Sequence, residues 1–233
     1  MVRSKAQSWL TKSYDAETRA QVQALLDNED PTELIESFYK DLEFGTGGLR
    51  GIMGVGSNRM NIYTVGAATQ GLSNYLKKEF ADLDQIKVVI GHDCRNNSRK
   101  FAEISADIFS ANGIKVYLFE DLRPTPEMSY TIRKLGCQSG IILTASHNPK
   151  QWNALKLLNE HGEFLNAAEG NEVLRIAEAE EFDFAEVDKL GSYRKDLTYN
   201  QKHIDSVLAL DLVDVEAIRK ADFRVAIDCV NSV

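Results

Sequence analysis

Apolar residues near the start of the chain recur at the three- and four-residue spacing that is typical of amphipathic helices. A first helix is expected after the N-cap residue Asp15, and a second after Asp30. Apolar positions continue the second helix through residues 34–42, and a third helical pattern covers residues 64–80. The N-terminal part of the chain is therefore predicted to be helical.

From residue 87 onward, short apolar runs alternate with helical patterns. Ser98 caps the first of the two intervening helices and Thr125 begins the second, and Gly113 and Gly136 end them. Strands that alternate with helices of this length favour a parallel sheet covered by helices on both faces. We therefore expect a three-layer α/β/α fold with a mostly parallel mixed sheet. The predicted strands cover residues 87–90, 115–119 and 140–143.

The third predicted strand turns abruptly polar at Thr144, and Pro149 stops its continuation. Ser146 should therefore lie on a tight loop beyond the carboxyl end of a core strand, where open α/β sheets place their chemistry. Lys156 follows in another apolar run, residues 154–158, which can carry its amine back to the same loop.

A glycine-rich segment precedes the predicted sheet, with four glycines between residues 45 and 51. The amides of Thr46, Gly47 and Gly48 are suited to binding an anion at close approach, and Arg50 adds a guanidinium suited to phosphate. The segment follows a predicted helix and lacks the GxGxxG spacing, so a dinucleotide site is disfavoured. A flexible loop between helices explains the same residues equally well.

Asp93 and Arg95 follow the first predicted strand and should lie on the same edge of the sheet as Ser146. A surface salt bridge between the two side chains is the simplest interpretation. Support of the Ser146 loop from below is the alternative.

Three kinds of chemistry compete at Ser146. An acyl-transfer hydrolase would place glycines around its serine in a GxSxG turn, which this serine lacks. A structural turn would use Ser146 and Asn148 only to bond local backbone. A covalent phosphoryl carrier needs positioning and positive charge more than a strong base, and Arg50 and Lys156 supply that charge.

The two remaining candidate residues are also open to more than one interpretation. An apolar setting lowers the pKa of an amine such as that of Lys156 and suits it to proton transfer, but the same side chain can simply reach water at a strand end. His147 is either a phosphate or sugar contact or a hydrogen bonder within the loop.

Composition narrows the classes of partner. The formal net charge of −8 disfavours a nucleic-acid binder, and an anionic ligand would have to be attracted by a local cationic cluster. Three widely spaced cysteines without a CxxC pair predict a reducing, cytoplasmic location. No apolar run approaches the length of a membrane span, and the N-terminus lacks a signal-peptide core. We therefore expect no membrane partner.

The last third of the chain is less regular. Asn166 should cap a helix that runs to about residue 181, and residues 178–188 form an acidic segment that we expect to be solvated. Two helical stretches occupy residues 199–220, and residues 224–228 have the pattern of a strand. A single strand cannot bury both faces without partners, which predicts the start of a second domain.

The α-D-phosphohexomutases, which include phosphoglucomutase and phosphomannomutase, have a phosphoserine loop that this chain resembles at Thr144-Ala145-Ser146-His147-Asn148-Pro149, with Asn153 and Lys156 behind it. Residues 44–51 are similar to the N-terminal active-site loop of that family. Residues 53–60 extend the similarity toward the phosphoglucomutases that also act on phosphopentoses.

The resemblance implies a mechanism. Phosphorylated Ser146 would donate its phosphoryl group to a hexose or pentose phosphate, and after reorientation of the bisphosphorylated sugar it would take back the other phosphate. The net reaction would move phosphate between C1 and C6 of a hexose, with a sugar bisphosphate as activator. Lys156 would be the general acid and base, assisted by Arg50, and Mg²⁺ would bind a phosphoryl oxygen on Ser146. The residues implied to support the loop are Thr144, Asp93, Arg95 and Asn153.

The chain departs from the family pattern in ways that limit this expectation. Ala154 stands where the family has glycine, and no DxDxDR metal loop, sugar-recognition loop or late phosphate loop is present. We therefore expect residues 1–198 to be the first domain and residues 199–233 the truncated start of the second, with little turnover without the remaining domains. The alternative is a non-catalytic α/β domain that binds a phosphorylated sugar at the glycine-rich segment.

Overall fold

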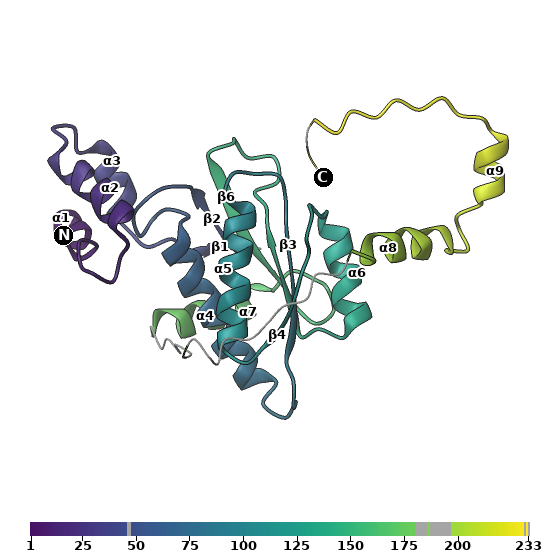
Figure 1. Cartoon of the computed structure of the whole chain (residues 1–233), viewed down its shortest axis with the longest axis horizontal. Coiled ribbons are helices and arrows are strands. Elements are labelled where there is room, and N and C mark those ends of the chain that lie inside the picture. Colours follow the sequence, from purple (N-terminus) through teal and green to yellow (C-terminus); the bar gives the residue numbers. More distant parts are fainter. Residues whose placement is uncertain (46–47, 180–185, 187–196, 231, 233) are drawn as a thin grey trace.

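The computed structural model describes residues 1–45, 48–179, 186, 197–230 and 232. Within these residues, six strands form one sheet that lies between helices (Figure 1). The strands are β1 (Phe44–Gly45), β2 (Gly48–Ile52), β3 (Lys87–His92), β4 (Lys115–Leu118), β5 (Ser139–Leu143) and β6 (Trp152–Leu158). The helices are α1 (Val2–Ser8), α2 (Ala16–Asp27), α3 (Thr32–Phe38), α4 (Ile62–Glu79), α5 (Ser98–Ala111), α6 (Thr125–Leu135), α7 (Ala167–Glu178), α8 (Tyr199–Leu208) and α9 (Val215–Lys220).

The sheet is mixed, in the order β1-β2-β6-β5-β3-β4. Strand β3 pairs in parallel with β4 and with β5, whereas β5, β6, β2 and β1 pair antiparallel along the sheet. The predicted α/β class with a mixed sheet is confirmed. Its parallel part is limited to three strands, because β6 returns directly from β5 and a directly returning strand must run antiparallel.

Each face of the sheet is covered by its own apolar cluster. Val88 and Ile90 of β3 pack with residues of α4, α5 and α7 on one face. Val89, between them, packs with residues of α6 on the other face. Side chains alternate between faces along a strand, so this segregation gives the three predicted layers.

The N-terminal helices α1, α2 and α3 form a cluster of their own around Trp9 and Phe38. Asp15 caps α2 as predicted, and its carboxylate accepts the Thr18 N–H at 2.8 Å. Asp30 is not the N-cap of α3, because Pro31 holds that position. Helix α3 also ends at Phe38, short of the predicted residue 42, and α1 was not predicted because only a few apolar residues mark it.

Other predicted boundaries also need correction. The N-cap of α5 is Asn97 in a left-handed conformation, and Ser98 instead turns its hydroxyl toward Asp93. Asn166 caps α7 as predicted, but the helix ends at Glu178. Most of the acidic segment 178–188 lies outside the described residues. The predicted strand at residues 224–228 does not form, and Ile227 is 80 % exposed.

Strand formation at residues 224–228 fails because no described segment pairs with it, and an apolar run needs a neighbouring backbone before it can join a sheet. Helix α8 lies against α6, where the Tyr130 hydroxyl is 2.8 Å from Ser206 Oγ. Among the described helices, none combines the length and the apolar character needed to span a membrane. The predicted domain boundary at residue 198 stays a prediction.

Candidate active site

The Ser146 loop leaves the carboxyl end of β5 and turns outward. Thr144 and Ala145 are buried, whereas Ser146 and His147 are exposed. Ser146 has a φ of 54°, in the left-handed region that residues other than glycine rarely adopt. Its amide donates to Thr144 Oγ1 at 3.2 Å, and its hydroxyl lies 3.3 Å from His147 Nδ1. The turn thus presents the hydroxyl to solvent on a constrained backbone.

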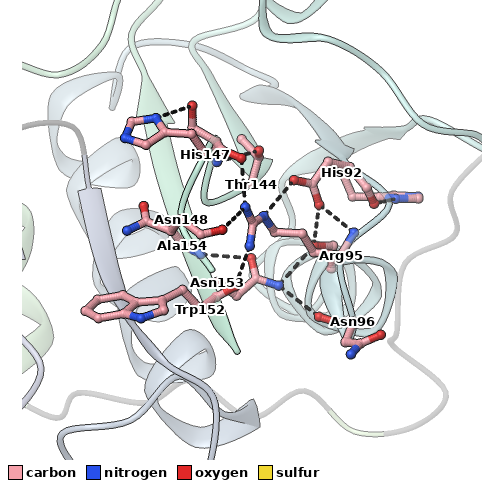
Figure 2. A network of polar contacts seen from close by, with 12 residues as sticks. His92, Arg95, Asn96, Thr144, His147, Asn148, Trp152, Asn153 and Ala154 are labelled. Carbon is pink, nitrogen blue, oxygen red and sulfur yellow. Dashed lines mark hydrogen bonds and ion pairs between the residues drawn. The ribbon is translucent and has the colours of Figure 1, made fainter. Parts of the chain in front are cut away.

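The guanidinium of Arg95, in the turn after β3, holds this loop through hydrogen bonds (Figure 2). Arg95 donates to the carbonyl oxygens of Ser146 and Asn148 at 2.7 and 2.6 Å. It also donates to those of Pro149 and Trp152 at 3.0 and 3.2 Å. Because a guanidinium is planar and rigid, these contacts fix several peptide groups of the loop relative to one another.

Asp93 holds Arg95 in place. Its carboxylate lies 3.5 Å from Arg95 Nε and accepts hydrogen bonds from the Arg95 amide and from Ser98 Oγ at 2.9 and 2.8 Å. The predicted salt bridge between Asp93 and Arg95 is present, but Asp93 is only 7 % exposed, so its predicted place at the surface is wrong. The pair is covered because β3 and β5 are parallel neighbours, which puts the turn after β3 beside the loop after β5.

Asn153 ties the start of β6 to the same turn. Its side-chain amide donates to the Asn96 carbonyl at 3.0 Å and to Ser98 Oγ at 2.9 Å, and its carbonyl oxygen accepts the Ala154 N–H at 2.8 Å (Figure 2). Sequence reasoning missed Asn96 and Ser98 as part of this network. Ser98 was assigned to a helix cap, which is the role that a serine at a helix start most often has.

Arg50 reaches the loop from the other side. In the antiparallel pair of β2 and β6, Arg50 lies opposite Ala154, and Lys156 is two residues further along β6. Residues two apart share a face, so the Arg50 and Lys156 side chains project from the same face of the sheet. Arg50 Nη1 donates to Asn148 Oδ1 at 3.3 Å. The structure therefore brings Arg50, Asn148 and the Ser146 loop together.

Lys156 is half-buried in β6. Burial lowers the pKa of its amine, and the positive charge of Arg50 lowers it further. The carboxylate of Asp93 acts in the opposite direction and raises it. The net direction is downward, as the sequence predicted for an amine in an apolar run.

The glycine-rich segment is largely part of the sheet. Thr46 and Gly47 lie outside the described residues, but residues 48–52 form β2, of which residues 49–52 pair with β6, so the predicted loop is wrong over this range. A Cβ on Gly48, which has a φ of 120°, would lie 2.0 Å from the Leu155 carbonyl oxygen. Glycine is needed there for the approach of two strands, and phosphate binding by Gly48 stays a prediction.

Comparison with known proteins places this geometry in a family. Residues 41–184 match the family described as phosphoglucomutase/phosphomannomutase, alpha/beta/alpha domain I. The chain belongs to this family. The predicted membership among the α-D-phosphohexomutases is confirmed, and the three-layer fold is the one that the family's first domain has.

Individual relatives agree with this assignment. The protein named phosphopentomutase from Mus musculus is 42 % identical over 160 residues, which are 66 % of this chain and 26 % of the relative. The phosphoglucomutase of Staphylococcus haemolyticus is 39 % identical over 141 residues, 60 % of this chain and 25 % of the relative. A putative phosphomannomutase from Thermus thermophilus superposes with a TM-score of 0.61 at 26 % identity, over 74 % of this chain and 37 % of that one. The chain spans about a quarter of the length of the curated relatives that it matches.

A metal site made only by the described residues is not present, since no three or more of their His, Cys, Asp and Glu side chains are grouped to hold an ion. The predicted Mg²⁺ would take a single ligand from this chain, an oxygen carried by Ser146. The exposed Ser146 hydroxyl fits that contribution, and the metal itself stays a prediction.

Proposed function

We propose that this chain carries the phosphoryl-transfer serine of a phosphosugar mutase that acts on a hexose or pentose phosphate. The observation that carries the proposal is the exposed Ser146 hydroxyl, held on a constrained loop by the four carbonyl contacts of Arg95. Arg50 and Lys156 add positive charge on the adjacent face of the sheet. The names of the relatives, phosphopentomutase and phosphoglucomutase, support a sugar phosphate as substrate.

The proposed reaction has two half-reactions that mirror each other. Phosphorylated Ser146 gives its phosphoryl group to a free hydroxyl of the sugar phosphate: the bond from phosphorus to Ser146 Oγ breaks, the bond from phosphorus to the sugar oxygen forms, and the proton that the sugar hydroxyl loses passes to Ser146 Oγ. The bisphosphorylated sugar then reorients. Ser146 Oγ takes the other phosphoryl group and gives up its proton, the bond from that phosphorus to the sugar oxygen breaks, and the proton passes to the sugar oxygen. Phosphate thereby moves between C1 and C6 of a hexose.

We assign to Lys156 the role of general acid and base, which moves the proton of the sugar hydroxyl. A general base works best when its pKa lies near the working pH, and burial together with Arg50 moves the pKa of Lys156 in that direction. We assign to Arg50 the stabilisation of the negative charge on the oxygens of the transferring phosphoryl group, because such transfers depend mainly on positioning and electrostatic stabilisation. Arg50 already contacts the loop through Asn148.

His147 and Asn148 are assigned to contacts with phosphate or sugar beside Ser146, which suits their place on the same exposed turn. Mg²⁺ bound to the phosphoryl oxygen on Ser146 would neutralise part of its negative charge. Ser146 would be its ligand from this chain, and none of the assignments above depends on the ion.

The competing proposal is a non-catalytic domain that binds a phosphorylated sugar at the glycine-rich segment. Its support is weaker, because residues 48–52 are engaged in the sheet rather than forming an open anion-binding loop. A cytoplasmic location is also proposed. Cys94, Cys137 and Cys229 are all free thiols, as a reducing compartment favours.

The Ser146→Ala substitution in the full-length enzyme tests the mutase proposal. We expect turnover of glucose 1-phosphate and of ribose 1-phosphate to fall by about 10³-fold or more, because the covalent route is removed while the loop is retained. Coupled spectrophotometric assays measure both rates. Low turnover is expected of the 233-residue chain by itself, which spans about a quarter of its relatives.

The matched control is Ser13→Ala, which removes an exposed hydroxyl from the N-terminal helical part. Wild-type rates are expected for this variant. If Ser146→Ala and Ser13→Ala both turned over substrate at the wild-type rate, Ser146 would not be the phosphoryl carrier.

A further inference from the structure

Lys156 has an aromatic neighbour that the sequence pattern did not reveal. After β6 the chain turns back, and Phe164 forms an antiparallel bridge with Leu158. The Leu165 amide donates to the Leu157 carbonyl at 3.1 Å, which continues this return. Opposed residues share a face of a sheet, as do residues two apart, so Phe164 and Lys156 project to the same side. Lys156 Nζ lies 5.5 Å from the centroid of the Phe164 ring.

The Phe164 ring is not part of the apolar core. Phe164 is 45 % exposed and belongs to none of the three apolar clusters of the described residues. Leu165, the next residue, packs against the main cluster instead. The Lys156 ammonium lies within cation–π distance of this half-exposed ring.

We propose that Phe164 is a positioning residue of the candidate active site, whose ring holds the Lys156 ammonium. This inference rests on the proposed function, in which Lys156 handles the proton. Along β6, Lys156 lies between Ala154, which is opposite Arg50, and Leu158, which is opposite Phe164. Arg50 and the ring therefore lie in opposite directions along β6 from Lys156.

Phosphate binding is expected to release this contact. A cation held by a ring at an exposed site is held weakly, whereas a phosphate dianion attracts an ammonium through full charges. An arriving phosphoryl group can therefore recruit Lys156 from the ring at little energetic cost. Between turnovers the ring keeps the amine in a defined place.

The electrostatic surroundings of Lys156 determine in which direction its pKa should move when Phe164 is replaced. Burial and Arg50 of β2 both lower the pKa of the Lys156 amine, and Asp93 in the turn after β3 raises it. The ring stabilises the charged amine and so opposes burial and Arg50. Replacing Phe164 by leucine keeps apolar cover but removes the π face, so the pKa of Lys156 should fall.

Competitive acetylation of the full-length protein, from neutral to alkaline pH, measures this directly. In Phe164→Leu, we expect the midpoint of Lys156 labelling to move to lower pH, and labelling at neutral pH relative to the alkaline plateau to rise about two- to fivefold. Phe164→Tyr retains an aromatic face and should titrate as wild type. Exposed Lys150 serves as the internal reference. The labelling rate of Lys156 at the alkaline plateau reports how accessible the amine is to the reagent, and the midpoint reports its protonation.

A Lys156 midpoint that is unchanged or raised in Phe164→Leu would overturn the proposal, as would a Phe164→Tyr variant that behaves like the leucine variant. The labelling involves no turnover. Its failure would therefore leave the phosphoryl-carrier role of Ser146 intact, and an active Ser146→Ala enzyme would leave the Phe164 contact intact.

Discussion

Arg95 contacts the backbone on both sides of His147 and does not contact the Ser146 hydroxyl, because its side chain donates to carbonyl oxygens. The sequence identified the residues of the loop from their order, because a polar stretch that ends in Pro149 after an apolar strand can only be a turn. It did not identify the contacts of Arg95. Backbone carbonyls are present at every residue, so nothing in the sequence marks which of them a guanidinium will bind.

The Arg95→Lys substitution in the full-length enzyme tests whether these contacts position the Ser146 loop. A lysine ammonium is a point charge and cannot hold several peptide groups in one plane, so the loop should shift. A misplacement of about 1 Å can cost roughly 10²-fold in rate, and we expect kcat to fall by about that factor with a smaller change in KM. Steady-state kinetics give both constants, and thermal melting verifies folding.

Arg99→Lys is the control, since Arg99 is exposed on α5 and pairs there with Glu103. Its kinetics should match wild type. Indistinguishable kcat values for Arg95→Lys and Arg99→Lys would mean that the carbonyl contacts do not position the loop for catalysis.

Among the elements, β2 is the one that the sequence misassigned and the site depends on. Four glycines between residues 45 and 51 carry poor intrinsic strand propensity, which predicted a loop. Pairing with β6 overrides that propensity and carries Arg50 to the face that Lys156 occupies. The strands that follow were predicted because their apolar runs are continuous, as expected for strands buried on both faces.

Two glycine-to-alanine substitutions test the role of β2. Gly48→Ala should destabilise the fold by about 2 kcal/mol or more, because its Cβ would lie 2.0 Å from the Leu155 carbonyl oxygen and its φ of 120° disfavours any side chain. Gly170→Ala should stabilise it by up to about 1 kcal/mol, because that position lies inside α7 with nothing within 4 Å of the new Cβ. Urea denaturation gives both values. Equal effects of the two substitutions would show that the close approach of β2 to β6 does not require glycine.

For the whole molecule, the family match begins at residue 41, after the N-terminal helices. Those helices are nevertheless joined to the matched part. Buried Arg59 donates to the Glu36 carbonyl at 3.1 Å and pairs with Glu33 at 2.9 Å. Long-range contacts of this kind depend on which segments meet in space, and the local sequence pattern does not contain that information. The same limit explains why the strand predicted at residues 224–228 does not form.

The phosphorylation state of Ser146 tests the central claim most directly. Full-length protein from its own cells, analysed by tandem mass spectrometry after incubation with glucose 1,6-bisphosphate, should carry phosphate on Ser146. Buried Ser98 and Ser139 should stay unmodified. An enzyme that interconverts sugar phosphates while Ser146 remains unmodified throughout would contradict the account.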